Sequence, residues 1–104
     1  TTLFRSVLSS ALETGIGMSH SLALAGSFPN LEYACGLGTL SLLESDICEP
    51  AFTATNGRIE IRRAEPVPAL LRKYQAGAER VEWWSRRITD IWQSEGFREG
   101  SQWS

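Results

Sequence analysis

The sequence has few of the side chains that most often bind metals or carry out acid–base chemistry. Its 104 residues contain one histidine, His20, one lysine, Lys73, and two cysteines. Cys35 and Cys48 are thirteen positions apart, which is not a metal-ligand spacing, and with a single histidine they cannot complete a Cys/His zinc site. A disulfide between them is one alternative, but the favoured interpretation is two reduced, largely buried thiols in a cytoplasmic protein.

Long apolar runs and a large excess of one charge are also missing. No run approaches the roughly 20 apolar residues of a membrane span. The net charge of −2 gives no reason to expect a nucleic acid or a membrane surface as a partner. The chain begins with Thr1 rather than Met and has no signal-peptide pattern before Phe4, which indicates an excised domain, a processed chain or a fragment.

The first half of the chain has the pattern of a strand, a helix and a second strand. Residues 3–9 are rich in residues that favour strands, and Thr14 is a suitable cap for a helix that extends to about Gly26. Residues 31–35 predict a second short strand, with the loop 36–39 leaving it. Strand, helix and strand over some thirty residues form a βαβ unit, whose strands should be parallel with a right-handed crossover.

The second half has a different character. Residues 40–43 favour one helical turn, and residues 57–63 alternate apolar and charged side chains as a half-exposed strand does. Pro66 and Pro68 predict the start of a short helix that continues to about Tyr74. Residues 78–92 form the clearest helix, with Glu82 and Arg86 paired on its surface. Its apolar stripe contains Val81, Trp84, Ile88 and Ile91. The tail, residues 93–104, is predicted to be loose.

One βαβ unit does not make a stable domain by itself. A parallel sheet needs both faces covered and neighbours on each edge, and two strands leave an edge of each unpaired. We therefore expect the sheet to be completed by residues outside this chain.

Several stretches together resemble one known family. The segment SSALETGIGMSHSLALAGSFPNLEYACGLGT looks like the seventh strand, seventh helix and eighth strand of the barrel in the enolase superfamily, within its muconate-lactonizing-enzyme branch. The stretches LLESDICEP, GRIEIRRAEPVP and ERVEWWSRR narrow the likeness to the carboxyl-terminal third of o-succinylbenzoate synthases, in particular those of actinobacteria. The likeness covers roughly residues 5–92.

The resemblance implies an α/β fold for the complete protein. Residues 1–45 would be the last βαβ part of a (β/α) barrel, comprising strand 7, helix 7 and strand 8. Residues 46–104 would be a carboxyl-terminal extension, with a strand and helices that return to the capping domain. The implied partners are the amino-terminal two-thirds of the barrel and a small-molecule carboxylate substrate.

The resemblance also implies a metal-dependent reaction. Such enzymes hold Mg²⁺ on three carboxylates at the ends of strands three to five and carry lysines on strands two and six. The metal stabilises an enediolate while a lysine removes the proton next to a carboxylate. The synthases dehydrate a succinyl-bearing cyclohexadiene carboxylate in menaquinone (vitamin K2) biosynthesis. Neither the lysines nor the metal ligands are expected in this chain, so the segment alone is predicted to be inactive, with no catalytic residue.

Candidate substrate-binding residues follow the two predicted strands. In a barrel the carboxyl ends of the strands face the active site. The resemblance implies that Ser9 or Ser10 contacts the succinyl carboxylate, and that Gly36 and Gly38 let it approach the backbone. The alternatives are that the serines satisfy nearby backbone groups and that the glycines form a plain turn.

Other polar residues have plainer explanations. Glu13 suits the first turn of a helix better than the role of a catalytic acid. Gly15 and Gly17 favour a tight turn over a phosphate loop. His20 is interpreted as solvated or packed. The cluster of Trp83, Trp84, Arg86 and Arg87 is interpreted as packing of the helix rather than nucleic-acid stacking.

Two other kinds of function remain open from the sequence. One comprises related enzymes of the same branch: N-acylamino acid racemases, dipeptide epimerases and muconate cycloisomerases. These relatives generally carry an acidic group near the end of strand eight, whereas residues 34–39 contain none. The other is a non-catalytic module that completes a split barrel.

Overall fold

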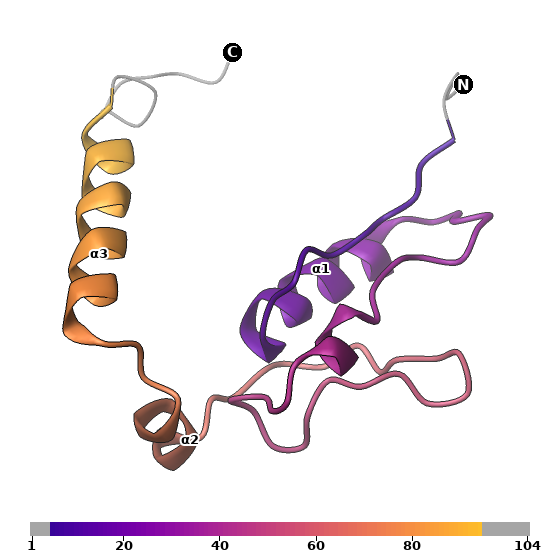
Figure 1. The fold of residues 1–104 in the computed structure, drawn as a ribbon. Helices are drawn as coiled ribbons and strands as arrows, with labels where there is room; N and C mark the ends of the chain where they lie inside the picture. The colour runs from indigo at the N-terminus through magenta and orange to yellow at the C-terminus, as the bar shows by residue number, and fades with distance from the viewer. Residues whose placement is uncertain (1–4, 95–104) are drawn as a thin grey trace. The chain divides into compact units, whose positions relative to one another are not determined.

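The computed structural model describes residues 5–94, which divide into two compact units between Tyr74 and Gln75. The first unit contains helix α1 (Gly15–Ser27), the 3-10 turn η1 (Thr39–Leu42) and helix α2 (Pro68–Lys73). The second contains helix α3 (Ala78–Gln93) (Figure 1). No helix among the described residues is long and apolar enough to cross a bilayer.

Helix α1 begins one residue after Thr14 and ends one residue beyond the predicted Gly26. Thr14 occupies the N-cap position as expected, but its side chain makes no capping hydrogen bond. The backbone N–H of Gly15 instead donates to Oδ1 of Asp46, at 2.7 Å. The prediction of Thr14 as the capping side chain is therefore wrong, and the first N–H of the helix is satisfied by a carboxylate distant in sequence.

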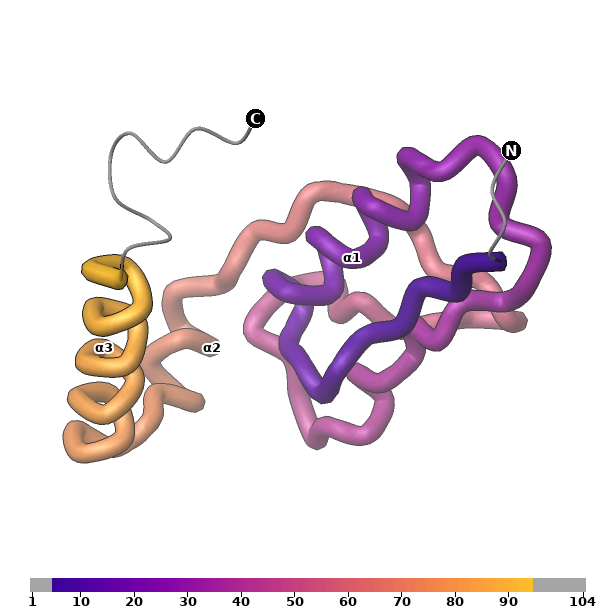
Figure 2. Tube along the Cα trace, turned by 90° about the horizontal axis from the view of Figure 1, so that it is seen from above, coloured from indigo at the N-terminus to yellow at the C-terminus, as the bar shows by residue number. Residues whose placement is uncertain are grey.

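The segments before and after α1 meet in a short parallel pairing. The N–H of Gly36 donates to the carbonyl of Leu8, and the N–H of Ser10 donates to the carbonyl of Gly36, both at 2.8 Å. Ser9 and Gly36 thus form a parallel bridge. In Figures 1 and 2 the segment that leads into α1 runs alongside the helix and turns back into it. The orientation is that of a βαβ crossover.

Extended strands do not form at the predicted positions within the described residues. Pairing of residues 5–9 with 31–36 is limited to the single bridge, and residues 3 and 4 of the first predicted strand lie outside the described part. Of residues 57–63, Gly57 lies in a tight turn and only Arg58 is bridged, to Thr55 across that turn. A strand is defined by a ladder, and this chain offers these segments no neighbour along most of their length.

The tight turn at residues 55–58 has a local cause. Asn56 and Gly57 both have positive φ, 52° and 72°, which matches the two-residue hairpin turn that Asn-Gly favours. Thr55 and Arg58 exchange both backbone hydrogen bonds, at 2.7 and 3.0 Å. The turn reverses the chain, and residues 59–67 then return towards the segment 46–48.

One small apolar core holds the first unit together. Met18 and Leu22 of α1 are at most 2% exposed, and Cys48 and Phe52 cover them from the segment after η1. Leu37 and Leu40 complete the cluster. The returning segment is attached by the bridge between Cys48 and Pro66 and by the N–H of Val67, which donates to the carbonyl of Ile47 at 2.8 Å. Residues 46–67 therefore pack on the face of α1 in this unit.

The later helices follow the sequence closely. The turn expected at residues 40–43 is η1, and α2 has Pro68 in its first turn, although it begins after Pro66. Helix α3 ends one residue beyond the predicted Trp92, and Arg86 donates to Glu82 at 2.8 Å as predicted. The predicted boundary at residue 45 concerns the barrel of a longer protein and stays a prediction. Most of the tail predicted to be loose, residues 95–104, lies outside the described part.

The apolar stripe of α3 is exposed within its own unit. Val81, Trp84, Ile88 and Ile91 keep 43–62% of their surface accessible, and α3 has no buried residue. Trp83 and Trp84 contact each other edge to face, with ring centroids 4.8 Å apart. A helix with one apolar stripe is stabilised mainly by packing that stripe against another element. The expected packing of Trp84 is therefore not supplied by residues 75–94.

Candidate functional site

The parallel bridge brings together the four residues predicted to bind a substrate. Ser9 and Ser10 follow the first extended segment, and Gly36 and Gly38 follow the second. We call residues 9–11 and 36–39 the mouth loops. Because the two segments are parallel at the bridge, both loops leave it on the same side. The structure thus places these residues on two adjacent loops, as the sequence predicted.

A chain of hydroxyl groups joins the two mouth loops. The hydroxyl of Thr39 donates to the backbone carbonyl of Ala11 at 2.7 Å. The Ser10 and Thr39 hydroxyl oxygens are 2.8 Å apart, and the Ser10 hydroxyl also lies 3.1 Å from the carbonyl oxygen of Gly36. Each hydroxyl has one hydrogen, so either Ser10 donates to Thr39 and Thr39 to Ala11, or Thr39 donates to Ser10 and Ser10 to Gly36. In both arrangements the Ser10 hydrogen is used within the protein.

Ser9 is held less firmly than Ser10. Its hydroxyl is exposed and lies 3.4 Å from the carbonyl oxygen of Gly36, longer than an ordinary O–H···O bond. A β-carbon on Gly36 would come within 2.8 Å of this hydroxyl oxygen. The glycine at position 36 therefore leaves room for the Ser9 side chain.

Gly38 has open space around its α-carbon. A β-carbon there would meet no atom within 4 Å, and the residue is exposed. Nothing in the first unit requires a glycine at this position for packing. The prediction that Gly36 and Gly38 let a carboxylate approach the backbone stays a prediction.

The ETGIG turn has a structural explanation in its two glycines. A β-carbon on Gly15 would lie 2.6 Å from Oδ2 of Asp46 and 2.8 Å from the ring of Phe52. A β-carbon on Gly17 would collide with the carboxylate of Glu13. That carboxylate also accepts a hydrogen bond from the Ser21 hydroxyl at 3.3 Å. Glu13 thus lies over the first turns of α1, in keeping with the interpretation of this acid as part of a helix start.

Asp46 is the important polar residue that sequence reasoning missed. Its side chain is 7% exposed and accepts three backbone N–H groups: Gly15 at 2.7 Å, Ile47 at 2.8 Å and Phe52 at 3.3 Å. The carboxylate joins the start of α1 to the loop 46–52, and its charge is favoured at a helix N-terminus. The pairing spans 31 positions, and no local pattern signals a cap at that separation.

The two cysteines are both free thiols, as favoured from the sequence. Cys48 is buried in the core, and Cys35 is half-buried. Burial raises the pKa of the Cys48 thiol, the Asp46 carboxylate raises it further, and Arg62 partly offsets them. A thiol kept protonated is a poor nucleophile and a poor metal ligand, so Cys48 acts as an apolar core residue. His20 is exposed, beside residues 61–64.

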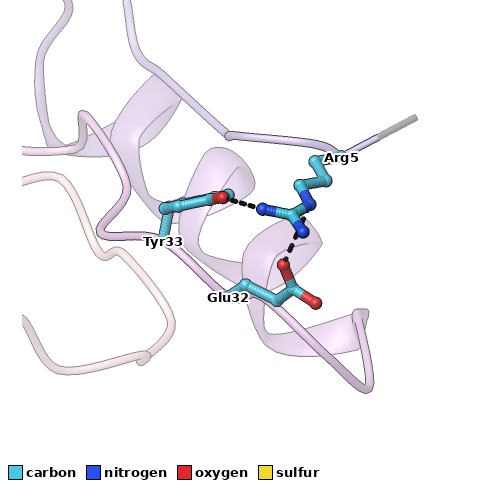
Figure 3. Close-up of polar contacts among 3 residues, drawn as sticks. All are labelled: Arg5, Glu32 and Tyr33. Carbon is cyan, nitrogen blue, oxygen red and sulfur yellow. Dashed lines mark hydrogen bonds and ion pairs between the residues drawn. The ribbon is translucent and has the colours of Figure 1, made fainter.

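A second polar cluster lies at the opposite ends of the paired segments. The Arg5 guanidinium forms an ion pair with Glu32 at 3.4 Å and donates to the Tyr33 hydroxyl (Figure 3). Both side chains of the ion pair are more than 60% exposed, so the pair contributes little to stability. Arg5 precedes Ser9, and Glu32 and Tyr33 precede Gly36, which places this cluster away from the mouth loops.

Residues 5–94 contain no group of three histidine, cysteine or acidic side chains that could hold a metal ion. Asp46, the one buried acid among these described residues, already accepts three backbone N–H groups. Lys73 is exposed on α2, next to the ring of Tyr74. The described residues therefore do not fit the magnesium site or the lysine pair that the resemblance implies.

Comparison with known proteins identifies relatives of one kind. No family model matches the chain. A curated o-succinylbenzoate synthase from Mycobacterium ulcerans is 42% identical over 82 residues, which are 79% of this chain and 25% of that protein. The synthases from Mycobacterium marinum and Mycobacterium tuberculosis are 42% and 40% identical over the same length, again 79% of this chain and 25% of each relative.

The chain thus spans about a quarter of the length of the curated relatives that it matches. The relatives carry the name of the synthases that the sequence resembles, and that name implies the enolase superfamily. The resemblance is confirmed as a similarity: 79% of this chain is 40–42% identical to about a quarter of curated o-succinylbenzoate synthases.

Proposed function

We propose that this chain is part of an enzyme that dehydrates 2-succinyl-6-hydroxy-2,4-cyclohexadiene-1-carboxylate to 2-succinylbenzoate, a lyase reaction of menaquinone biosynthesis. The observation that carries the proposal is the 40–42% identity to o-succinylbenzoate synthases over 82 residues. This identity does not favour the racemase, epimerase or cycloisomerase alternatives, nor a separate non-catalytic module.

In this proposal α1 is the seventh helix of a (β/α) barrel, and the segments that flank it belong to strands seven and eight. The parallel bridge between Ser9 and Gly36 across α1 supports that arrangement. The amino-terminal two-thirds of the barrel would supply the remaining strands and convert the single bridge into full ladders. The exposed stripe of α3 would be covered by the capping domain of the same protein.

The mouth loops would hold the succinyl carboxylate of the substrate. Carboxylates are bound well by hydroxyl and backbone N–H donors, and the carboxyl ends of barrel strands surround the site. Ser9, Ser10, Gly36 and Gly38 would supply this part of the pocket. Holding the remote carboxylate fixes the ring relative to the reacting centre, which converts binding energy into orientation.

Magnesium and the catalytic lysines would come from other parts of the complete protein. When bound, the metal would stabilise the enediolate formed on proton removal. The described residues offer no ligand set for it, so we derive no step of the reaction from them. The contribution of this chain is to bind and orient the substrate.

The test is product formation by the full-length protein that contains this segment. We expect ultraviolet spectroscopy to show magnesium-dependent conversion of the cyclohexadiene substrate to 2-succinylbenzoate, abolished by EDTA and restored by Mg²⁺. An N-acylamino acid racemisation assay run in parallel distinguishes the closest alternative. Turnover of the N-acylamino acid without dehydration would contradict the proposal, as would product formation by residues 1–104 alone.

A further inference from the structure

We infer that Thr39 is a positioning residue of the substrate pocket: by pairing with the Ser10 hydroxyl, it leaves Ser9 as the serine that donates to the substrate carboxylate. The inference rests on the proposed function and deepens it. The family resemblance leaves the choice between Ser9 and Ser10 open.

The hydrogen-bond directions carry the first step. The Ser10 and Thr39 hydroxyl oxygens are 2.8 Å apart, and each hydroxyl has one hydrogen. When Thr39 donates to Ala11, Ser10 donates to Thr39; when Thr39 donates to Ser10, Ser10 donates to Gly36. The Ser10 hydrogen is thus committed within the protein, and its remaining lone pairs would repel a carboxylate. Ser10 is half-buried, in keeping with a role between the loops.

The freedom of Ser9 carries the second step. The contact of its hydroxyl with the Gly36 carbonyl is 3.4 Å long, and that oxygen already accepts the N–H of Ser10 at 2.8 Å. A carboxylate is a stronger acceptor than a shared carbonyl, because charge-assisted bonds are shorter and stronger. The exposed Ser9 hydroxyl can turn to a ligand at little cost.

The pairing of Ser10 with Thr39 also sets the distance between the mouth loops. It bridges residues 29 positions apart, beside the backbone bonds between Ser10, Gly36 and Leu8. Removing either partner would loosen the same connection. The two substitutions should therefore have the same effect, and combining them should add little.

The experiment compares variants of the full-length protein by steady-state kinetics with the cyclohexadiene substrate. Thr39→Val and Ser10→Ala should each raise KM about three- to tenfold with kcat within twofold of wild type, the size expected for one hydrogen bond. The double variant should be no worse than either single one. Ser9→Ala should raise KM more than Ser10→Ala does. Thr39→Ser keeps the hydroxyl group and should therefore leave KM and kcat at their wild-type values.

Thr53→Val is the matched control, because it makes the same chemical change at an exposed residue of the first unit. The inference is overturned if Ser10→Ala raises KM more than Ser9→Ala does, or if Thr39→Val lowers KM. It is also overturned if Thr39→Val lowers kcat without changing KM, as a merely structural role would.

A measurement without substrate separates this inference from the proposed function. If the wild-type protein forms no 2-succinylbenzoate, the proposed function is wrong, and so is the assignment of Ser9 as the donor to that substrate. The pairing of Ser10 and Thr39 is still tested by urea unfolding of the single and double variants. Non-additive changes in the unfolding equilibrium constant support the pairing, and additive changes contradict it.

Discussion

Asp46 joins two parts of the first unit through a single carboxylate. Both oxygens accept backbone N–H groups, one at the start of α1 and two in the loop 46–52. Gly15 is the glycine that allows the carboxylate to approach so closely. The first mouth loop, residues 9–11, precedes α1, so Asp46 fixes the start of the helix that follows this part of the candidate site.

Replacing Asp46 by Asn should destabilise the protein. The amide keeps one acceptor oxygen but turns an NH₂ group towards backbone donors, which leaves a buried N–H unsatisfied. We expect a loss of about 1–3 kcal/mol in the free energy of unfolding, measured by urea denaturation. Glu49→Gln removes a charge from an exposed neighbour and serves as the control, with a change within about 0.5 kcal/mol. Equal effects of the two variants would contradict this role for Asp46.

Gly15→Ala should also destabilise, although alanine favours helices by up to about 1 kcal/mol over glycine. The added β-carbon would meet Asp46 at 2.6 Å and Phe52 at 2.8 Å, and both are held by the core. At Gly77 a β-carbon would meet no atom within 4 Å, so Gly77→Ala provides the comparison. A Gly15→Ala protein with a melting temperature at or above wild type would show that the close approach is wrong.

The raised pKa of Cys48 predicts a pH dependence of stability. In the folded protein the Cys48 thiol stays protonated at a pH at which it already ionises in the unfolded chain. Its contribution to the free energy of unfolding is therefore complete below about pH 8.5. It is lost as the pH rises towards the folded pKa. We expect Cys48→Ala to flatten the decline of the unfolding free energy above about pH 8.5. We also expect alkylation of Cys35 to precede that of Cys48. Faster labelling of Cys48 would contradict its burial.

The elements differ in how far sequence predicts them, and the cause is the range of the interactions that define each. Helices α2 and α3 have local signals: Pro68 in a first turn, and a stripe of apolar residues at helical spacing. The predicted strands needed neighbours that residues 5–94 do not supply, and they are reduced to the isolated bridges Ser9–Gly36 and Thr55–Arg58. The placement of the four candidate binding residues followed from the βαβ pattern. The hydroxyl contacts of Ser10 and Thr39 did not, because they depend on how the two loops fold against each other.

The exposed stripe of α3 gives a prediction for the complete protein. If the capping domain covers this stripe, Ile88→Asp should bury an unpaired charge and lower the unfolding free energy of the full-length protein by several kcal/mol. Thr89→Asp introduces the same charge one position away, off the stripe, and should change it by less than about 1 kcal/mol. Equal effects in denaturant unfolding would indicate that the stripe stays in solvent.

At the scale of the whole molecule, the chain has more apolar surface and more unpaired backbone than its core can cover. Within residues 5–94 the core cluster contains six residues, whereas the stripe of α3 is exposed and the paired segments share a single bridge. Such edges and patches are sites of association between chains. The proposed remainder of the barrel would cover both.

Residues 1–104 produced alone should therefore self-associate or behave as a partly molten protein. We expect a concentration-dependent mass in sedimentation experiments, or a broad thermal transition with binding of a hydrophobic dye. The isolated chain should show no specific Mg²⁺ binding by calorimetry. A sharp cooperative melt from a monodisperse monomer would contradict the view that these residues are completed by others.

The most direct test of the account is a crystal structure of the full-length protein with 2-succinylbenzoate bound. The account predicts that residues 3–9 and 31–35 are adjacent parallel barrel strands joined across α1. It also predicts that the Ser9 hydroxyl lies about 2.7 Å from an oxygen of the succinyl carboxylate. An antiparallel or separate placement of the two segments, or a product carboxylate held away from residues 9–11 and 36–39, would contradict it.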